Sequence, residues 1–260
     1  MLEQRILDVY QLLSRSNTSA QFVKTSTLHE DEIAKLWRVF EEHHTITYEE
    51  FLARCREKCD MTALFRDALS GEIVGFMGVR HKDLTLKSGE TISTLYFGHG
   101  FILQAYRGQQ LIQRTVLALY LRCILKVPTR RVFIWSNALT VRPYLLTAKD
   151  LQEYYPHPVK AWPEDVREIR DRLGQHYYGD DFDSARGVVR KRSRYVNEHM
   201  LHIRPEKLHD PHVQLYLRLN PNYIRGDGLL TIQPATLKNL SFYMQLLLAN
   251  HLTPRARSRR

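Results

Sequence analysis

One stretch of the chain, residues 91–144, constrains the fold more than any other. An apolar, β-rich run over 92–103 ends at the basic turn 106–108, whose sequence is Tyr-Arg-Gly. An amphipathic helical pattern begins directly after this turn and ends before Pro128, and a second β-rich run over 131–135 follows. Strand, turn, helix and strand in this order predict a βαβ unit within a mixed or parallel sheet.

A helix that begins directly after a basic, glycine-containing turn is a candidate anion-binding site. Its first N–H groups have no partner within the helix, and the helix dipole favours negative charge there. An ordinary βαβ crossover that exposes Arg107 would show the same local pattern. The residues alone leave both interpretations open.

The charge balance indicates an acidic partner without identifying it. The chain has 260 residues and a formal net charge of +10, with basic runs at 190–194 and 254–260. Nucleic acid, a phosphorylated cofactor or an acidic carrier protein would each suit this balance, as would no partner at all if the charges are only solvated. With 43% hydrophobic residues, the chain can bury a core as one large domain or two small ones.

The three cysteines, Cys55, Cys59 and Cys123, are too few and too scattered for a disulfide scaffold and indicate a reducing compartment. No pair of His or Cys residues follows Cys55 and Cys59 at zinc-binding spacing, so no metal site is predicted. Residues 1–17 lack a signal-peptide pattern, and no apolar run approaches the roughly 20 residues of a membrane span. We therefore expect a cytoplasmic protein without a membrane span.

Periodicity and turn residues divide the rest of the chain into elements. Strands are predicted over 21–28, 62–69, 73–79, 213–219 and 229–233. Helices are predicted over 2–14, 29–40, 51–58, 137–149, 164–177 and 235–252, and a basic helix or irregular segment over 182–196. The expected organisation is an N-terminal helix (1–17), a core (18–150), a mainly helical insertion (151–209), a segment that completes the core (210–252) and a basic tail (253–260).

This order of elements resembles the GNAT superfamily of N-acetyltransferases and its acyltransferase relatives, of which the chain would be a divergent member. The resemblance implies an α/β (α+β) fold with a mixed, mostly antiparallel twisted sheet flanked by helices, here with a helical insertion. Two motifs carry it: residues 101–108 match the family's approach to its Arg-x-x-Gly-x-Gly/Ala loop, and Asn137 and Tyr144 have the family's seven-residue spacing.

The loop itself departs from the family pattern. Gln110 and Ile112 occupy the positions at which the family has glycines, which let the backbone approach the cofactor pyrophosphate closely. Backbone N–H donation from Gly108 to Leu111 remains available, and Arg107 can add a charge-assisted contact to a phosphate.

By resemblance, the cofactor is acetyl-CoA or another acyl-CoA. The N–H near Ile102 would bind its pantetheine arm or the acyl carbonyl, and Asn137 would contact the same arm or order the strand end. The predicted cofactor-binding residues are Phe101, Ile102, Arg107, Gly108, Gln109, Gln110, Leu111 and Asn137.

The candidate catalytic residues are Tyr144, His99 and Tyr96. The resemblance places Tyr144 where it would protonate the CoA thiolate, although a core tyrosine is an equally acceptable interpretation. The family often has its general base on the fourth strand, where this chain offers Tyr96 and His99 in place of a carboxylate. These two face opposite sides of a regular strand unless a bulge changes the parity, and His99 between two glycines can also be structural.

Three functions remain open from the sequence. The first is transfer of an acyl group from acyl-CoA to an amine of a small molecule or peptide. The second is a related N-acyl transferase or synthase that takes the acyl chain from acyl carrier protein, favoured by the basic surface and the altered loop. The third is a GNAT-fold module without catalysis that binds a partner; nucleic acid is the less expected partner because the basic run at 190–194 fits a solvated face.

Overall fold

The computed structural model describes residues 18–149, 151–191 and 195–252. The helix predicted over 2–14 and the basic tail over 253–260 lie outside the described residues. The strands are β1 (Thr18–Lys24), β2 (Met61–Asp67), β3 (Ile73–Thr85), β4 (Thr91–Ile102), β5 (Val132–Ala138), β6 (Phe182–Asp183), β7 (Val188–Val189) and β8 (Gly228–Pro234).

The helices follow the predicted order except for α7, a short helix that was not predicted, and α8, described below. They are α2 (Glu30–Phe40), α3 (Tyr48–Lys58), α4 (Leu111–Lys126), α5 (Val141–Ala148), α6 (Glu164–Tyr178), α7 (Glu198–Leu201), α8 (Pro211–Leu219) and α9 (Leu237–Leu252). Short 3-10 turns are η1 (Thr25–Thr27), η2 (Glu41–His43), η3 (Gln104–Tyr106), η4 (Gly179–Asp181), η5 (Pro205–Lys207) and η6 (Tyr223–Arg225).

Local chemistry starts helix α3 at Tyr48, three residues before the predicted start at residue 51. The Thr47 hydroxyl accepts the N–H of Glu50 at 3.2 Å, and the Glu50 carboxylate accepts the N–H of Thr47 at 3.0 Å. This capping box satisfies donors that the first helical turn leaves without partners. The helix predicted over 51–58 is confirmed, and the capping box accounts for its earlier start.

The described strands form one eight-stranded sheet in the order β1-β2-β3-β4-β5-β8-β7-β6. All neighbouring pairs are antiparallel except β4 and β5, which are parallel and are joined by α4. Strand, two helices, three antiparallel strands, helix, strand and helix follow one another as the resemblance implies. The fold is therefore GNAT-like, and the predicted mixed, mostly antiparallel α/β architecture is confirmed.

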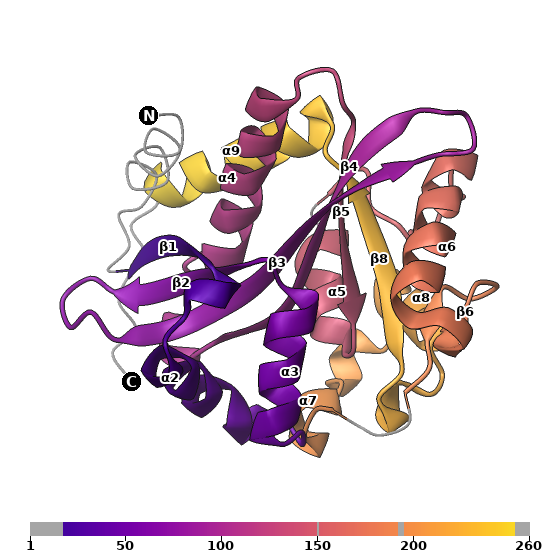
Figure 1. The fold of residues 1–260 in the computed structure, drawn as a ribbon. Helices are drawn as coiled ribbons and strands as arrows, with labels where there is room; N and C mark the ends of the chain where they lie inside the picture. Colours follow the sequence, from indigo (N-terminus) through magenta and orange to yellow (C-terminus); the bar gives the residue numbers. More distant parts are fainter. Residues whose placement is uncertain (1–17, 150, 192–194, 253–260) are drawn as a thin grey trace.

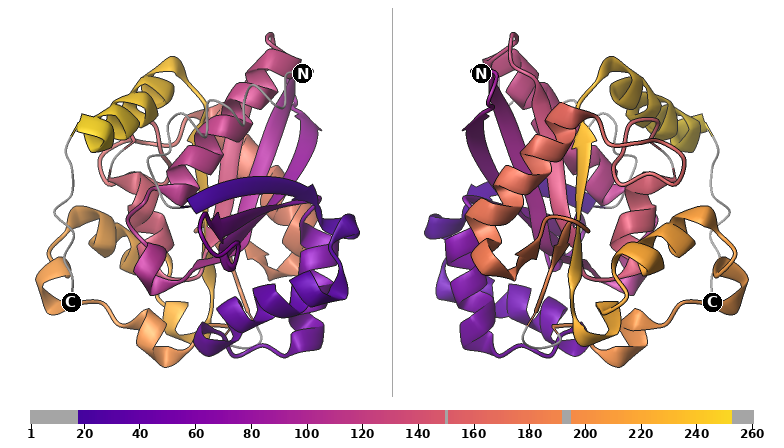
Figure 2. Two further views of the ribbon diagram at one scale, coloured as in Figure 1. Left: turned by 90° about the vertical axis from the view of Figure 1, so that its left-hand side faces the viewer. Right: turned by 90° about the vertical axis from the view of Figure 1, so that its right-hand side faces the viewer.

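Helices cover both faces of the sheet (Figures 1 and 2). Leu95 of β4 and Ile134 of β5 share one core with residues of α4, α5, α8 and α9. On the other face, Tyr96 and Trp135 pack with α6, and Phe101 packs with α2 and α3. Successive side chains of β4 and β5 thus point into two different cores, so these strands are buried on both faces and not on one.

The strand predicted over 213–219 is wrong, because this segment forms helix α8. The Asp210 side chain accepts a backbone N–H two residues on, at 2.9 Å, and Pro211 occupies the first turn. Val213 and Tyr216, three positions apart, are both fully buried on one side of the helix. The alternating apolar residues suggest a strand, but the Asp-Pro start signal and this three-residue spacing favour a helix.

The helical interpretation of residues 182–196 is also wrong for the first part of this segment. Here β6 and β7 form a hairpin, and Val188 and Val189 pair with Leu229 and Gly228 of β8. The segment predicted as an insertion therefore adds two short strands to the main sheet as well as helix α6. None of the helices in the described ranges combines the length and apolar composition that crossing a bilayer requires.

Candidate active site

The two parallel strands of the sheet separate halfway along their length. β4 and β5 are paired only from Ser93–Tyr96 to Val132–Trp135. Beyond this point β4 remains paired with β3 up to Ile102, and β5 remains paired with β8 up to Ala138. Within the described residues, the edge of β4 that faces β5 therefore has no strand partner after Tyr96. Backbone donors and acceptors along such an edge are available to a ligand.

A β-bulge interrupts β4 directly beyond this point. Phe76 pairs with Phe101 and Gly78 pairs with Gly98, so one residue of β3 faces two residues of β4, His99 and Gly100. His99 takes a left-handed conformation with φ of 48°. The extra residue reverses the alternation of side chains along the strand. The bulge that the sequence required for Tyr96 and His99 to share a face is thus present.

The Tyr96 and His99 side chains lie on the same side of β4. Their ring centroids are 6.2 Å apart. The Tyr96 ring lies across Gly98: a Cβ at Gly98 would be only 2.0 Å from the Tyr96 hydroxyl oxygen. Burial raises the pKa of Tyr96 and keeps its phenol protonated.

His99 is a neutral imidazole with an unused nitrogen. Its pKa is lowered from 6.5 to about 3, first by burial and then by the positive charges of Lys58, Arg54 and Lys191. Its Nε2 is buried and has no hydrogen-bond partner among the described residues. A buried nitrogen of this kind can accept a proton or a hydrogen bond from a ligand.

Asn137 and Tyr178 extend this group from β5 and from the end of α6. The Asn137 side chain packs on Gly228, where a Cβ would lie 1.9 Å from its Oδ1, and this oxygen is buried without a partner among the described residues. The pKa of Tyr178 is raised to about 12 because its hydroxyl is buried, an effect opposed by a hydrogen bond with Asn137. Tyr96 and Tyr178 also interact through their hydroxyls. The structure thus brings three predicted site residues together with one that was not predicted.

The loop before α4 keeps the backbone shape of a glycine-rich turn. Gly108 has φ of 81°, and Gln110, at one of the family's glycine positions, has φ of 58° and ψ of 30°. A glutamine in this left-handed region pays a steric cost that glycine avoids. The Leu111 side chain is buried in the core, so only its N–H can face a ligand. Gln109 accepts a hydrogen bond from the Thr18 hydroxyl at 3.1 Å.

Two arginines lie at this loop. Arg107 donates from Nε to the Ile102 carbonyl oxygen at 2.9 Å, and its guanidinium carbon is 4.9 Å from the centroid of the Phe101 ring. The pKa of Arg107 is lowered by burial and by the nearby charge of Arg142 on α5. Arg107 and Arg142 therefore place two positive charges close to the first N–H groups of α4.

Tyr144 lies away from the Tyr96–His99 group, in the core on the other face of the sheet. It is fully buried, and its hydroxyl donates to the Pro156 carbonyl oxygen at 3.1 Å. Its ring centroid is 5.8 Å from that of Tyr154 and 5.7 Å from that of Tyr216. Burial raises the pKa of Tyr144. The structure does not bring this predicted catalytic residue next to the other two.

Four charged or hydrogen-bonding residues at the site were missed from the sequence: Tyr178, Lys58, Arg54 and Arg142. Tyr178 and Lys58 end helices α6 and α3, and no local pattern distinguishes them from ordinary surface residues. Lys191 belongs to the basic run at 190–194, whose composition is visible but whose side chains have no predictable direction.

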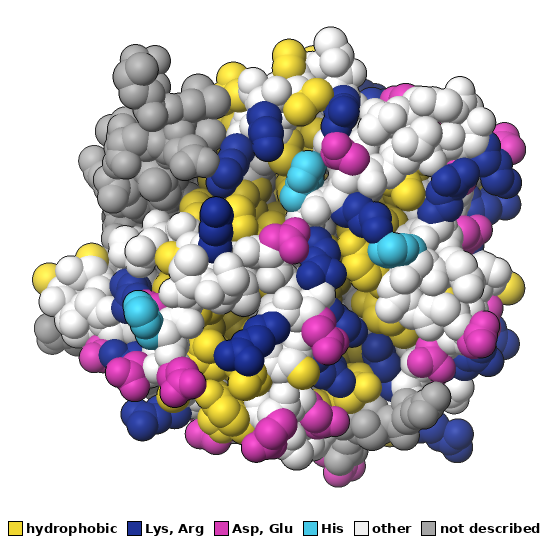
Figure 3. Space-filling view, in the orientation of Figure 1, with side chains coloured by type: hydrophobic (Ala, Val, Ile, Leu, Met, Phe, Trp, Pro, Cys, Tyr) yellow, Lys and Arg dark blue, Asp and Glu magenta, His cyan; other side chains and the backbone are white. Residues whose placement is uncertain are grey.

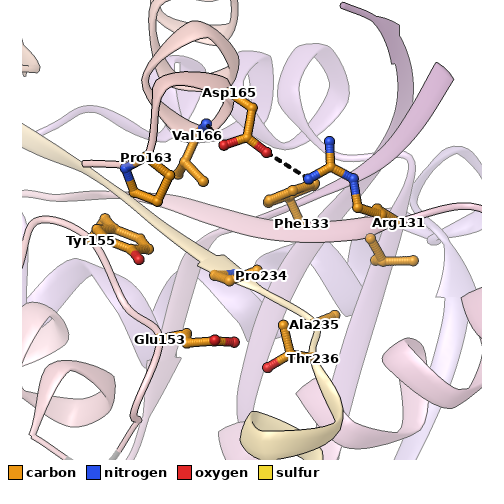
Figure 4. Close-up of a pocket in the computed structure, with 11 residues that line it drawn as sticks. Arg131, Phe133, Glu153, Tyr155, Pro163, Asp165, Val166, Pro234, Ala235 and Thr236 are labelled. Atoms are coloured by element: carbon orange, nitrogen blue, oxygen red, sulfur yellow. Dashed lines mark hydrogen bonds and ion pairs between the residues drawn. The ribbon is translucent and has the colours of Figure 1, made fainter. Parts of the chain in front are cut away.

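Two of the hollows on the surface of the described residues differ in their charge. One, of about 400 Å³, is lined by residues at the ends of α3 and α6 and after β7, including Lys58, Tyr178, Lys191 and Tyr195. The other, of about 230 Å³, lies at the beginning of β5 (Figure 4). There Arg131 already forms ion pairs at 2.6 Å with Asp165 and with Glu90. The second hollow is at the opposite end of β5 from Asn137, and its arginine is neutralised.

No group of three or more His, Cys, Asp or Glu side chains within the described ranges is arranged to hold a metal ion. The thiols of Cys55 and Cys59 are buried, and burial raises the pKa of Cys55 to about 12. These thiols are therefore protonated at neutral pH.

No protein-family model and no curated protein sequence matches this chain. Solved structures with similar folds include Saccharomyces cerevisiae N-myristoyltransferase with bound myristoyl-CoA, at 10% identity and a TM-score of 0.37 over 47% of this chain. This chain spans 29% of that myristoyltransferase.

Two further structures match at a similar level. The NatC complex bound to Gag peptide and CoA has 10% identity and a TM-score of 0.35, over 47% of this chain and 76% of that chain. A probable N-acyltransferase from Enterococcus faecalis V583 has 10% identity and a TM-score of 0.36, over 52% and 33%. Structural similarity at this level carries no information about the activity of this chain. The fold follows from its own strand order.

Proposed function

We propose that this protein is an N-acyltransferase that takes an acyl group from acyl-CoA and transfers it to an amine. The observation that carries the proposal is the separation of β4 from β5 directly after Tyr96, with the N-terminal loop of α4 at the end of the gap. A free strand edge can hold an extended amide-containing arm, and a helix N-terminus can hold phosphates.

The residues at the α4 loop fit the phosphate end of acyl-CoA. No hydrogen bond joins the N–H groups of Gln109, Gln110 and Leu111 to described residues, and Arg107 and Arg142 supply positive charge. Arg107 can leave the Ile102 carbonyl for a phosphate, because a charge-assisted bond is the stronger of the two. The Gln110 side chain leaves less space for the pyrophosphate than a glycine would, and its Oε1 is buried without a partner in the described part of the chain.

In the proposed reaction, acyl-CoA supplies an activated thioester. His99 Nε2 accepts a proton from the attacking amine, because it is unprotonated and has no other partner in the described structure; burial and the nearby cations lower its pKa and weaken it as a base. Tyr96 and Tyr178, both held protonated by burial, can donate a proton to the departing thiolate. Asn137 orients Tyr178 by hydrogen bonding. The role predicted for Tyr144 remains a prediction, which is tested below.

Calorimetric titration with acetyl-CoA and with longer acyl-CoAs tests the cofactor. We expect saturable binding that Arg107→Ala weakens about tenfold or more, because a charge-assisted hydrogen bond is lost. Arg167→Ala is the matched control, since Arg167 is an exposed residue of α6 with no ion pair among the described residues. Absence of binding to any acyl-CoA would rule out the proposed donor.

Acyl carrier protein is the second candidate donor, and Gln110 favours it. A carrier-borne phosphopantetheine lacks the pyrophosphate that the family's glycines accommodate, so the glutamine would not obstruct it. Acyl transfer from acyl carrier protein, without binding of acyl-CoA, would support this alternative. Salt-sensitive association with a partner and no acyl transfer from either donor would instead support a binding module.

A further inference from the structure

The hollow between the ends of α3 and α6 gathers positive charge next to the proposed catalytic group. On the face shown in Figure 3, Lys and Arg side chains lie along the depression between α3 and α6. The hollow measures about 400 Å³, within the range of pockets that hold small molecules. Tyr178 lines it and also hydrogen-bonds with Asn137, so this ring separates the hollow from the Tyr96–His99 group.

Three cations converge on two aromatic rings here. The Lys191 ammonium is 4.7 Å from the centroid of the Tyr178 ring, and the Lys58 ammonium is 5.4 Å from the same centroid. The Arg54 guanidinium carbon is 3.8 Å from the Tyr195 ring centroid. None of the three cations forms an ion pair with a carboxylate of the described residues, although aromatic faces partly compensate them.

The arrangement costs free energy in the absence of an anion. Lys191 is partly buried, and its pKa is lowered to about 7 by that burial and by the charges of Lys58 and Arg54. The pKa of Lys58 is lowered by burial and by the charge of Arg54. Asp181, which also lines the hollow, and Asp227 act in the opposite direction on the pKa of Lys191. Asp227 accepts the backbone N–H of Lys191 at 2.9 Å, and neither carboxylate forms an ion pair with its ammonium. Charges held together at such a cost are typical of functional sites.

We propose that Lys58, Lys191 and Arg54 bind an anionic group, a carboxylate or a phosphate, of the acyl acceptor and hold its amine toward His99. This inference rests on the proposed function and specifies its substrate: a small amine that also carries a negative charge. Tyr178 lines the hollow and interacts with Tyr96, whose ring centroid is 6.2 Å from that of His99, so a molecule whose anion occupies the hollow has to extend past this one ring to reach the proposed base. A bound anion would also offset the positive field that weakens His99 as a base.

Binding without an acyl donor gives the first test. The full chain is titrated with inorganic phosphate and with β-alanine by calorimetry at about pH 6, where Lys191 is charged. We expect Lys191→Gln and Lys58→Gln each to weaken binding about tenfold, and Lys191→Arg to retain it. Arg167→Gln is the control for net charge. Equal affinities in all four variants and the wild type would overturn the proposal, as would no binding of either probe.

Acyl transfer to matched amines gives the second test. β-Alanine is compared with its neutral amide, and phosphoethanolamine with ethanolamine, which also separates a carboxylate from a phosphate. We expect the anionic member of one pair to have the higher kcat/KM by about tenfold or more, and Lys191→Gln to abolish this preference. Melting curves monitored by circular dichroism verify that each variant folds.

The two proposals fail in distinguishable ways. If acyl-CoA binds and neutral amines are acylated as well as anionic ones, the anion site is overturned and the acyltransferase stands. If phosphate or β-alanine binds through Lys58 and Lys191 but no acyl donor is used, the anion site stands and the proposed reaction fails. Arg107→Ala, which acts at the loop before α4, should leave the binding of β-alanine unchanged, whereas inorganic phosphate can also bind at that loop.

Discussion

The ring of Tyr96 lies across Gly98 with its centroid 6.2 Å from that of His99, although these two aromatic residues are three positions apart on one strand. In a regular strand, residues separated by an odd number face opposite sides. The bulge at His99 and Gly100 removes this restriction, and Gly98 leaves space for the phenol. The site therefore depends on a departure from regular strand geometry.

Gly98→Ala tests this dependence. The new Cβ would lie 2.0 Å from the Tyr96 hydroxyl oxygen, so the ring must move, and we expect a loss of about 1–3 kcal/mol in the free energy of unfolding. Urea denaturation measures it. In a Tyr96→Ala background the same substitution should cost much less, because the obstructing ring is gone. Equal costs in the two backgrounds would show that the ring does not occupy this space.

Gln110→Gly examines the loop before α4. Gln110 has φ of 58°, so glycine removes a conformational penalty of about 1 kcal/mol, whereas Gln110→Ala removes the amide and keeps the penalty. We expect the glycine variant to be more stable than the alanine variant by about 1 kcal/mol in urea denaturation. The glycine variant should also bind acetyl-CoA more tightly than the wild type. A glycine variant less stable than the alanine variant would contradict the left-handed conformation.

Much of the fold follows from local sequence signals, because most elements have both a periodic pattern and a recognisable start. The basic turn at Arg107, the helix after it and the strands on either side of Gly71 all lie close to where the sequence predicts them. The strand prediction for 213–219 is wrong because apolar residues alternate within a short helix, and neither the period nor the length distinguishes a helix from a strand there. The start signal at Asp210 carries the information that the alternation obscures.

The candidate site is only partly predictable, for a physical reason. His99, Tyr96 and Asn137 lie on strands whose order is predictable, so their approach could be foreseen once a bulge is allowed. Tyr178 and Lys191 reach the same place from segments whose docking depends on tertiary packing. The burial of Tyr178 and Lys191 depends on residues that are distant in the sequence, so no local pattern predicts their roles.

The free energy of unfolding at acidic pH tests the environment of His99. Its pKa is about 3 in the folded chain against an ordinary value of 6.5, because of burial and the charges of Lys58, Arg54 and Lys191. Between these values the unfolded chain binds a proton that the folded chain does not, so stability falls as pH falls from 6.5 to 3. His44, with a pKa lowered to about 4, contributes in the same direction.

His99→Gln should therefore reduce the slope of unfolding free energy against pH in this window. A single group contributes at most about 1.4 kcal/mol per pH unit, so the wild type and the variant should differ by up to that amount. Urea denaturation at a series of pH values measures the slope. His209→Gln, at an exposed position, is the control. Parallel curves for the wild type and His99→Gln would contradict a buried neutral imidazole.

Tyr144→Phe and Tyr178→Phe separate a core tyrosine from a catalytic one. Loss of the hydrogen bond from Tyr144 to the Pro156 carbonyl should cost about 1 kcal/mol of stability and leave acyl transfer nearly unchanged. Loss of the Tyr178 hydroxyl, which hydrogen-bonds with Asn137 beside the proposed base, should lower kcat by about tenfold to a hundredfold without weakening acyl-CoA binding. Steady-state kinetics on folded variants, with calorimetry for the cofactor, measures both. If Tyr144→Phe lowers kcat and Tyr178→Phe does not, the role implied by the family resemblance holds and the proton donor lies on α5, on the face where Tyr144 is now covered by α8.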